Sequence, residues 1–213
     1  MITYYILIGI IAYLLGSISF SIIFGKKFAG IDVREKGSKN AGSTNVLRTV
    51  GKKAAILTLF CDILKGVIAV LIAYVFGLFI EGINRALLLQ IAGIFVVIGH
   101  SFPIFFHFKG GKGVATSLGV LLMINWQIGL ICLVFAILIM ILTKIVSLGS
   151  IMAAVLFPVL TIFIQQNYLV PNSNYVVFGI LLATYVVFLH RTNIQRILEG
   201  KENKLSFNKT KLN

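Results

Sequence analysis

The sequence contains only six acidic residues and two cysteines among its 213 residues. Magnesium and calcium sites are built from clustered carboxylates, and the few acids here form no cluster, so no such metal is expected. Cys61 and Cys132 lie inside apolar runs and form neither a Cys-x-x-Cys pair nor a Cys/His ligand pattern, which argues against a disulfide or a zinc site. We therefore expect no metal and no other cofactor, and we interpret both cysteines as packing residues.

Polar sequence is also scarce. Hydrophobic residues make up 59% of the chain and the mean hydropathy is +1.02, which leaves too little polar surface to cover a soluble globule. The net charge of +13 comes from lysines and arginines in the loops between apolar runs, with no basic helix or aromatic-interleaved patch. Membrane topology and anionic lipid headgroups explain this charge better than nucleic acid does. The sequence predicts an all-α integral membrane protein that lies in a lipid bilayer and does not bind nucleic acid.

The apolar runs predict the number of membrane spans, because a helix needs ~20 apolar residues to cross a bilayer. The N-terminal run has no charged segment before it and no cleavage site of small residues after it, so we interpret it as a retained first span. The run at 114–143 is long for one span, and two amides and an interfacial tryptophan interrupt it at 125–127. The runs cover about 2–24, 54–80, 86–106, 114–143, 146–166 and 175–189.

The basic residues favour splitting the run at 114–143, which gives seven transmembrane helices with the N-terminus outside and the C-terminus in the cytoplasm. With seven spans the outer loops keep only Arg85. With six spans Lys144 and the basic tail would lie outside, which the positive-inside rule disfavours. No internal repeat or long linker is visible, so residues 1–202 are predicted to form one domain, followed by a basic cytoplasmic tail at 203–213.

A Lys-Gly-Gly-Lys-Gly turn at 109–113 follows the third apolar run. Glycines let backbone N–H groups approach a phosphate, while Lys109 and Lys112 supply charge and Thr116 a hydroxyl. The turn is not a P-loop, because Gly113 stands where that motif requires Ser or Thr and no strand pattern precedes it. The composition favours a phosphorylated ligand over the alternative that the glycines only break a helix and the lysines only mark a cytoplasmic loop.

Two further polar clusters share the predicted cytoplasmic face. Residues 34–48 are dense in Gly, Ser, Thr and Asn, whose N–H and hydroxyl groups bind either the backbone or an anionic ligand. A helix continuing through 190–200 would place His190 and Asn193 on one face. Taken alone, the first cluster is more typical of an ordinary capped loop, and the second is balanced between an interfacial histidine and a catalytic one.

Two pairs in or beside the spans also have open interpretations. Asp62 and Lys65 stand three residues apart in the second apolar run. We favour a mutual structural ion pair at the floor of a site over a direct functional role, because isolated charges at that depth are costly. Ser147 and Ser150 lie beside Lys144 and either add hydroxyls to a phosphate site or serve helix packing as small residues.

Taken together, the clusters resemble a known family. The motifs that carry the resemblance are Gly37-Ser-Lys-Asn-Ala-Gly-Ser-Thr-Asn45 with Arg48, then Gly99-His100…Phe102-Pro103…Gly110-Gly-Lys-Gly-Val-Ala-Thr116, and His190-Arg-x-Asn193-Ile-x-Arg196…Gly200-x-Glu202. Through them the chain resembles the bacterial PlsY-type acyl-phosphate:glycerol-3-phosphate acyltransferases over nearly its whole length. It departs from their pattern at Lys39, where a glycine is usual, and at Ser43, where an alanine is usual.

The resemblance implies a seven-span enzyme of the bacterial cytoplasmic membrane whose active site faces the cytoplasm. Such enzymes move an acyl group from acyl phosphate to glycerol 3-phosphate, giving lysophosphatidic acid and phosphate in the first step of phospholipid synthesis. The soluble acyltransferase that produces acyl phosphate is a further candidate partner. A transporter of phosphorylated metabolites is the alternative function, disfavoured because the polar clusters lie at one face and no internal repeat appears.

The resemblance and the chemistry together predict a role for each cluster. Positioning of the substrates and fixed positive charge are expected to contribute most to catalysis. Arg48 and Lys112 neutralise phosphate charge, and either His190, oriented by Asn193, or a substrate phosphate oxygen accepts the glycerol hydroxyl proton. Ser38 is interpreted as a phosphate ligand in a direct transfer, because its cluster offers no adjacent base for a nucleophile. The predicted phosphate-binding residues are Asn40, Thr44, Asn45, Gly110, Gly111, Gly113, Ser147 and Ser150, and the predicted structural supports are His100, Asp62, Lys65 and Glu202.

Overall fold

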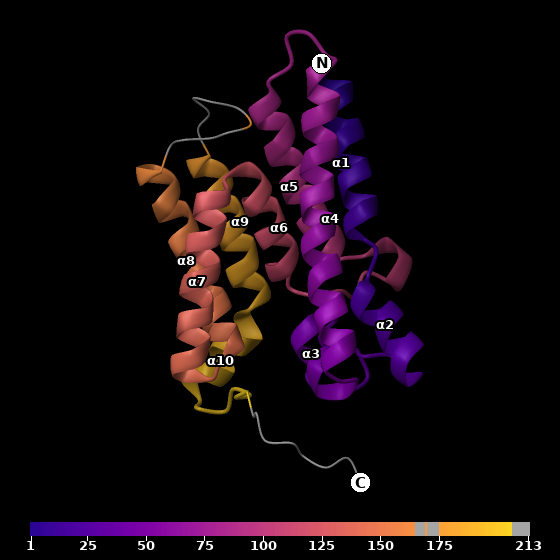
Figure 1. Cartoon of the computed structure of the whole chain (residues 1–213), viewed down its shortest axis with the longest axis vertical. Helices are drawn as coiled ribbons and strands as arrows, with labels where there is room; N and C mark the ends of the chain where they lie inside the picture. Colours follow the sequence, from indigo (N-terminus) through magenta and orange to yellow (C-terminus); the bar gives the residue numbers. More distant parts are fainter. Residues whose placement is uncertain (165–168, 170–174, 206–213) are drawn as a thin grey trace.

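Every regular element is a helix in the part of the chain that the computed structural model describes, which is residues 1–164, 169 and 175–205 (Figure 1). Five helical stretches are long and apolar enough to cross a membrane, and the bent pair α9–α10 would be a sixth. The helices are α1 (Ile2–Gly16), α2 (Phe20–Ala29), α3 (Ser43–Thr49), α4 (Lys52–Leu78), α5 (Arg85–Ser101), the 3₁₀ turn η1 (Ile104–Phe106), α6 (Val114–Ile124), α7 (Trp126–Thr143), α8 (Val146–Phe163), α9 (Val176–Leu189) and α10 (Arg191–Leu198).

The long helices form two groups joined by α6. Helices α1, α4 and α5 pack together, α8 packs against both α7 and α9, and α6 packs against α4, α5 and α7 (Figure 1). One apolar core runs through both groups and includes Ile8, Val70, Leu88, Val120 and Phe178. The short helices lie near the same end of the bundle, where α2 packs against α3 and α10 packs against α8 and α9 (Figure 1).

Glycines allow α4 and α6 to cross closely. A side chain on Gly66 of α4 would collide with the carbonyl oxygen of Thr116 on α6, and one on Gly119 of α6 would collide with the carbonyl oxygen of Ile63 on α4. Small residues at such positions let the two backbones approach, which is how membrane helices gain packing where lipid removes the hydrophobic drive. The crossing fixes the start of α6, and with it the glycine turn, beside α4.

The first apolar run is not one helix. Helix α1 ends at Gly16 and α2 begins at Phe20, so the predicted run at 2–24 contains a break. The ammonium of Lys65 on α4 donates to the carbonyl oxygens of Gly16 at 3.0 Å and Ile18 at 2.8 Å. These bonds satisfy two backbone acceptors that the break frees from helical pairing, which is why the interruption is tolerated inside an apolar bundle.

The split of the run at 114–143 is confirmed. Helix α6 ends at Ile124, and the side chain of Asn125 accepts a hydrogen bond from the N–H of Ile128 at 3.2 Å to cap α7. However, α6 has 11 residues and rises only ~16 Å, about half of a ~30 Å hydrocarbon layer. Helix lengths therefore give five or six full crossings and one short segment, and the count of seven spans stays a prediction.

Candidate active site

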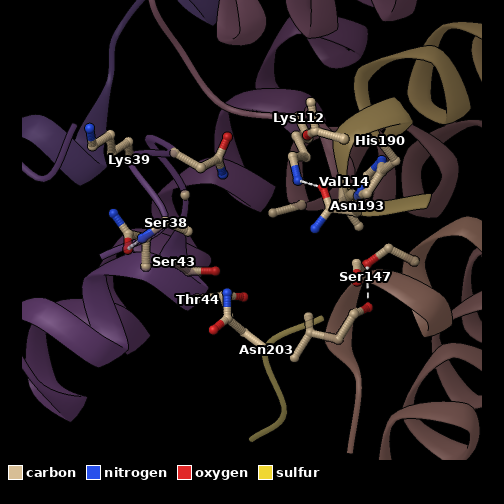
Figure 2. A pocket seen from close by; sticks show the side chains of 18 of the residues that line it. Ser38, Lys39, Ser43, Thr44, Lys112, Val114, Ser147, His190, Asn193 and Asn203 are labelled. Carbon is tan, nitrogen blue, oxygen red and sulfur yellow. Dashed lines mark hydrogen bonds between the residues drawn. The ribbon is translucent and has the colours of Figure 1, made fainter. Parts of the chain in front are cut away.

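The three polar clusters predicted from the sequence meet in one cavity of about 260 Å³. Figure 2 shows Ser38, Ser43 and Thr44 on one side and Lys112, His190 and Asn193 on the opposite side. The predicted residues that do not line the cavity are Lys65, Lys109, Gly110, Gly111 and Thr116. Those that line it are Ser38, Asn40, Thr44, Asn45, Arg48, Asp62, His100, Lys112, Gly113, Ser147, Ser150, His190, Asn193 and Glu202.

Asn45 shapes the first wall from within. Its Oδ1 accepts a hydrogen bond from the N–H of Ser38 at 2.9 Å, and its Nδ2 donates to the carbonyl oxygens of Val33 at 2.7 Å and Lys36 at 3.1 Å. The residue is 1% exposed, and these three bonds engage both ends of its amide. Its amide therefore holds the loop that carries Ser38, and direct phosphate binding by Asn45 stays a prediction.

The remaining polar side chains of this wall are free. In the described part of the chain, the hydroxyls of Ser38, Ser43 and Thr44 and the amide of Asn40 have no hydrogen-bond partner, although all four residues line the cavity. Arg48 on α3 adds a guanidinium that donates to the carbonyl oxygen of Asn203 at 3.4 Å. This wall therefore presents hydroxyl and amide donors beside a cation, a set that suits a phosphate.

Lys112 leads the opposite wall. Its ammonium donates to Oδ1 of Asn193, while Nδ2 of Asn193 donates to Oε1 of Glu202 at 2.7 Å. Burial, together with the positive charges of Arg196 and Arg48, lowers the pKa of Lys112 to about 8, although Glu202 opposes the shift. The negative charge of Glu202 does not offset the effect of burial on this pKa. An incoming anion would add negative charge and raise the pKa of Lys112 back toward its ordinary value.

His190 is buried against the same wall at the junction of α9 and α10. Its Nδ1 lies 2.8 Å from the carbonyl oxygen of Val186, one turn earlier, so Nδ1 carries the proton in the neutral ring. Nε2 then keeps its lone pair. The Val186 carbonyl holds the ring, while the amide of Asn193 binds Lys112 and Glu202, and orientation of the imidazole by Asn193 stays a prediction.

The glycine turn packs closely against the end of α5, and two of its N–H groups bond there instead of facing a ligand. The N–H of Gly110 donates to the carbonyl oxygen of Ser101 at 3.0 Å, and that of Gly111 donates to the carbonyl oxygen of His100 at 3.1 Å. A side chain at either glycine would collide with His100. Both N–H groups are thus engaged by the protein, and their binding to a phosphate stays a prediction. Gly113 lines the cavity at a φ of +77°, and its N–H has no acceptor among the described residues.

The two serines of α8 are also engaged. Ser147 donates its hydroxyl to Oε1 of Glu202 at 3.0 Å, and Ser150 donates to the carbonyl oxygen of Val146 at 3.0 Å. Both line the cavity, but neither hydroxyl has a hydrogen left to give a phosphate in this state. Ser147 holds Glu202 and Ser150 bonds back within its own helix, and a phosphate-binding role for either serine stays a prediction.

Asp62, Lys65 and His100 form the buried floor. The Asp62 carboxylate pairs with the Lys65 ammonium at 2.8 Å, and Nδ1 of His100 lies 3.4 Å from the same oxygen. The three side chains are 2%, 2% and 6% exposed. A mutual ion pair at the floor of the site is what the sequence predicted for the first two, and the pair also reaches the α1–α2 break through Lys65.

A family model described as "Glycerol-3-phosphate acyltransferase" matches residues 6–200 of this chain. The chain belongs to the glycerol-3-phosphate acyltransferase family. A member of this family from Clostridioides difficile (strain 630) is 46% identical over 201 residues, covering 94% of this chain and 95% of the relative. Another from Thermoanaerobacter sp. (strain X514) is 47% identical over 203 residues, covering 95% of this chain and 96% of the relative.

Solved structures of the same family have the same fold. The crystal structure of PlsY (YgiH), described as an integral membrane glycerol 3-phosphate acyltransferase in its glycerol 3-phosphate form, is 38% identical, with a TM-score of 0.83 and coverage of 95% of this chain and 96% of that one. The structure of PlsY in its lysophosphatidic acid form is 37% identical, with a TM-score of 0.81. The resemblance drawn from the three motifs is thereby confirmed.

In this acyltransferase-family chain the site extends beyond the boundary predicted at 202. Asn203 lines the cavity, and its carbonyl oxygen accepts the bond from Arg48. The N–H of Leu205 donates to the carbonyl oxygen of Lys144 at 2.7 Å. We name residues 200–205 the C-terminal strap. No residue pattern beyond Glu202 indicates the strap, because its bonds use backbone groups that every residue carries.

Glu202 fastens the strap. Its Oε2 accepts from Nε of Arg196 at 2.8 Å, and its Oε1 accepts from Ser147 and Asn193. Burial alone would raise the pKa of this carboxyl, but the hydrogen bonds from Arg196, Asn193 and Ser147 outweigh it and lower the pKa. Arg196, to which the sequence assigned no role, therefore holds the predicted support Glu202 in its ionised form.

Lys39 has a backbone conformation that suits the glycine expected at its position. Its φ is +59°, in the left-handed region that glycine enters without steric cost. Its N–H donates to the carbonyl oxygen of Lys36 at 3.0 Å and so closes a turn instead of facing a phosphate. In Figure 2 its ammonium lies on the side of the cavity away from Lys112. The lysine keeps the backbone shape and adds a cation at the rim.

Proposed function

We propose that this chain transfers an acyl group from acyl phosphate to glycerol 3-phosphate, giving lysophosphatidic acid and inorganic phosphate. One observation carries the proposal: unpartnered donors around Ser38 face Lys112 and an imidazole with a free Nε2 across a single cavity. The family membership and the ligand forms named for the two PlsY structures support it. The donor would come from a soluble acyltransferase that produces acyl phosphate.

The two substrates are both anions, so the site has to hold them together against their repulsion. Arg48 and Lys112 place one cation on each wall, and the free donors around Ser38 add hydrogen bonds to phosphate oxygens. Acyl phosphate is already an activated anhydride whose phosphate leaves readily. Positioning and fixed charge are therefore the main work left to the protein.

The bond changes balance without any further reactant. The glycerol hydroxyl oxygen attacks the acyl carbonyl carbon and forms the ester bond, while the bond from that carbon to the phosphate oxygen breaks and phosphate leaves with the electron pair. The hydroxyl proton passes to Nε2 of His190 or to an oxygen of the leaving phosphate. Because the Val186 carbonyl fixes the proton of His190 on Nδ1, the Nε2 lone pair is available to accept the hydroxyl hydrogen.

Direct transfer predicts a distinct kinetic pattern. Ser38 and His190 stand on opposite sides of the cavity in Figure 2, so Ser38 has no base for nucleophilic attack. Enzyme in lipid, given acyl phosphate and radiolabelled glycerol 3-phosphate, should form lipid-soluble product with intersecting initial-rate plots. Acyl phosphate alone should give no stoichiometric phosphate burst.

Two other results of that assay would contradict the proposal. An acyl ester recovered on Ser38, with parallel initial-rate plots, would show a covalent intermediate instead of direct transfer. Unmodified label that accumulates inside vesicles, without lipid-soluble product, would show a transporter. Boiled enzyme and enzyme-free vesicles are the controls.

We further propose that the cavity faces the cytoplasm across a bacterial cytoplasmic membrane, with seven membrane segments and the N-terminus outside. The short helix α6 is the segment that raises the count to seven. It follows the glycine turn and ends at the Asn125 cap. The loops at Lys39 and Lys144 would then be cytoplasmic, and the loop at Glu81 would be outside. The excess of lysine and arginine in the cavity-side loops supports this orientation.

Single cysteines test the orientation in a chain whose native cysteines, Cys61 and Cys132, are replaced by alanine. Lys39→Cys and Lys144→Cys should react with an impermeant thiol reagent only after the cells are opened, whereas Glu81→Cys should react in intact cells. All three native residues are exposed, so access depends on the side of the membrane alone. Labelling of Lys144→Cys in intact cells would require an even number of crossings before it.

A further inference from the structure

Arg34 joins two loops without lining the cavity. Its NH1 donates to the carbonyl oxygen of Phe106 at 2.6 Å and to that of Lys109 at 3.3 Å. Its Nε and NH2 bind the Asp32 carboxylate at 2.7–3.2 Å. The loop that carries Ser38 and the loop that carries Lys112 are therefore tied together by one guanidinium.

The segment between those two carbonyls is strained. His107 and Phe108 have φ values of +58° and +55°, and neither is a glycine. Two successive side chains in the left-handed region cost free energy, and such a turn persists only where its surroundings fix it. Arg34 binds the carbonyls immediately before and after the pair, so it holds the turn at both ends.

The strained turn leads directly to Lys112. After it, the N–H groups of Gly110 and Gly111 donate to carbonyls at the end of α5, and the next residue directs its ammonium to Asn193. On the other side, the carbonyl of Val33, next to Arg34, accepts from the amide of Asn45, which also holds the N–H of Ser38. Displacing Arg34 would therefore change the position of Lys112 relative to the wall that carries Ser38.

We propose that Arg34, aligned by Asp32, is a positioning residue for acyl transfer that sets Lys112 against the opposite wall by holding the His107–Phe108 turn. This role rests on the acyl transfer proposed above. The guanidinium suits it because Asp32 engages Nε and NH2 and leaves NH1 for the two carbonyls. A lysine ammonium at the same place is a point charge without that fixed fork.

The test substitution is Arg34→Lys, which keeps the charge and removes the fork. We expect kcat to fall about 10- to 100-fold while KM for glycerol 3-phosphate changes less than about threefold, because a small displacement of a transition-state group acts on the chemical step. Arg85→Lys is the matched control, since Arg85 is exposed at the start of α5 and does not line the cavity, and it should keep wild-type kcat. Arg34→Lys with wild-type kcat would overturn the proposal.

A double substitution separates positioning from general damage to the fold. In a Lys112→Ala background, assayed over hours with radiolabelled acceptor, Arg34→Lys should lower the residual kcat less than about twofold, because the group that it positions is gone. An equal loss in both backgrounds would overturn the proposal.

The remaining outcomes are also distinguishable. If Arg34→Lys does not accumulate in the membrane, Asp32→Asn takes its place in the same cycle, because it weakens the alignment of Arg34 with little change in volume. If the wild-type enzyme forms no lipid product, that result would instead contradict the proposed acyl transfer itself.

Discussion

Lys112→Ala is expected to lower kcat/KM by about 100- to 1,000-fold, which is ~2.7–4 kcal/mol of transition-state stabilisation and matches the loss of one oxyanion donor. The ammonium faces the donors around Ser38 and is partly buried. Water therefore screens its charge only weakly, and water that fills the space in the alanine variant would stabilise the substrate's negative charge less well. Steady-state rates with both substrates varied would measure the effect. Lys109→Ala is the matched control: it lies in the same loop and does not line the cavity, so its kcat/KM should stay within about twofold of wild type.

The pH dependence of kcat/KM adds a test of the same residue. Because the pKa of Lys112 is lowered to about 8, its positive charge is present below pH 8 and is lost as the pH rises through 8. A phosphate monoester has its second pKa near 6 and keeps its charge over that range. Wild-type kcat/KM should therefore fall above pH 8, and Lys112→Arg should lack this limb because guanidinium stays protonated. A Lys112→Ala enzyme with wild-type kcat/KM would show that Lys112 does not stabilise the transition state.

His190→Ala is expected to lower kcat by about 100- to 10,000-fold if Nε2 accepts the hydroxyl proton, the range for a positioned general base. The prediction follows from the Val186 carbonyl, which fixes the neutral tautomer and leaves Nε2 as the acceptor. Single-turnover measurements would separate this loss in chemistry from slow product release. The expected loss is in kcat, because the imidazole makes its contribution as the hydroxyl ionises.

His190→Gln distinguishes the two proton acceptors. Its amide oxygen can accept a hydrogen bond from the substrate hydroxyl but cannot take its proton. If His190 is the base, glutamine and alanine should be equally slow. If a phosphate oxygen takes the proton and His190 only orients the hydroxyl, the glutamine enzyme should recover most of the rate.

The sequence predicted which segments build the site because polar residues are rare in this chain. Arg48 precedes an apolar run, while Lys112 and His190 each follow one, and a lipid-embedded chain concentrates such groups where water and ligands reach them. The ion pair between Asp62 and Lys65 was predictable for the same reason. Opposite charges three residues apart on one helix can pair, and burying the pair costs less free energy than burying either charge alone.

The sequence could not predict which polar groups remain free for a ligand. Asn45 and Thr44 are adjacent and both polar, yet Asn45 is consumed by loop carbonyls while Thr44 faces the cavity without a partner. The same holds for Gly110, whose N–H finds Ser101 only because α5 ends where it does. Partner choice depends on the approach of distant backbone, and a residue type does not specify that approach.

The C-terminal strap has a consequence for how the enzyme is made. Arg48 and the Asn203 carbonyl that it binds are 155 residues apart, so the wall around Ser38 exists long before its counterpart. At translation rates of roughly 5–20 residues per second, those 155 residues take about 8–30 s to follow. During that interval the nascent chain has its first cationic wall in the membrane but lacks His190, Glu202 and the strap. A ribosome-bound chain is therefore catalytically silent until Asn203 has emerged, and release before that residue leaves an inserted protein without a complete site.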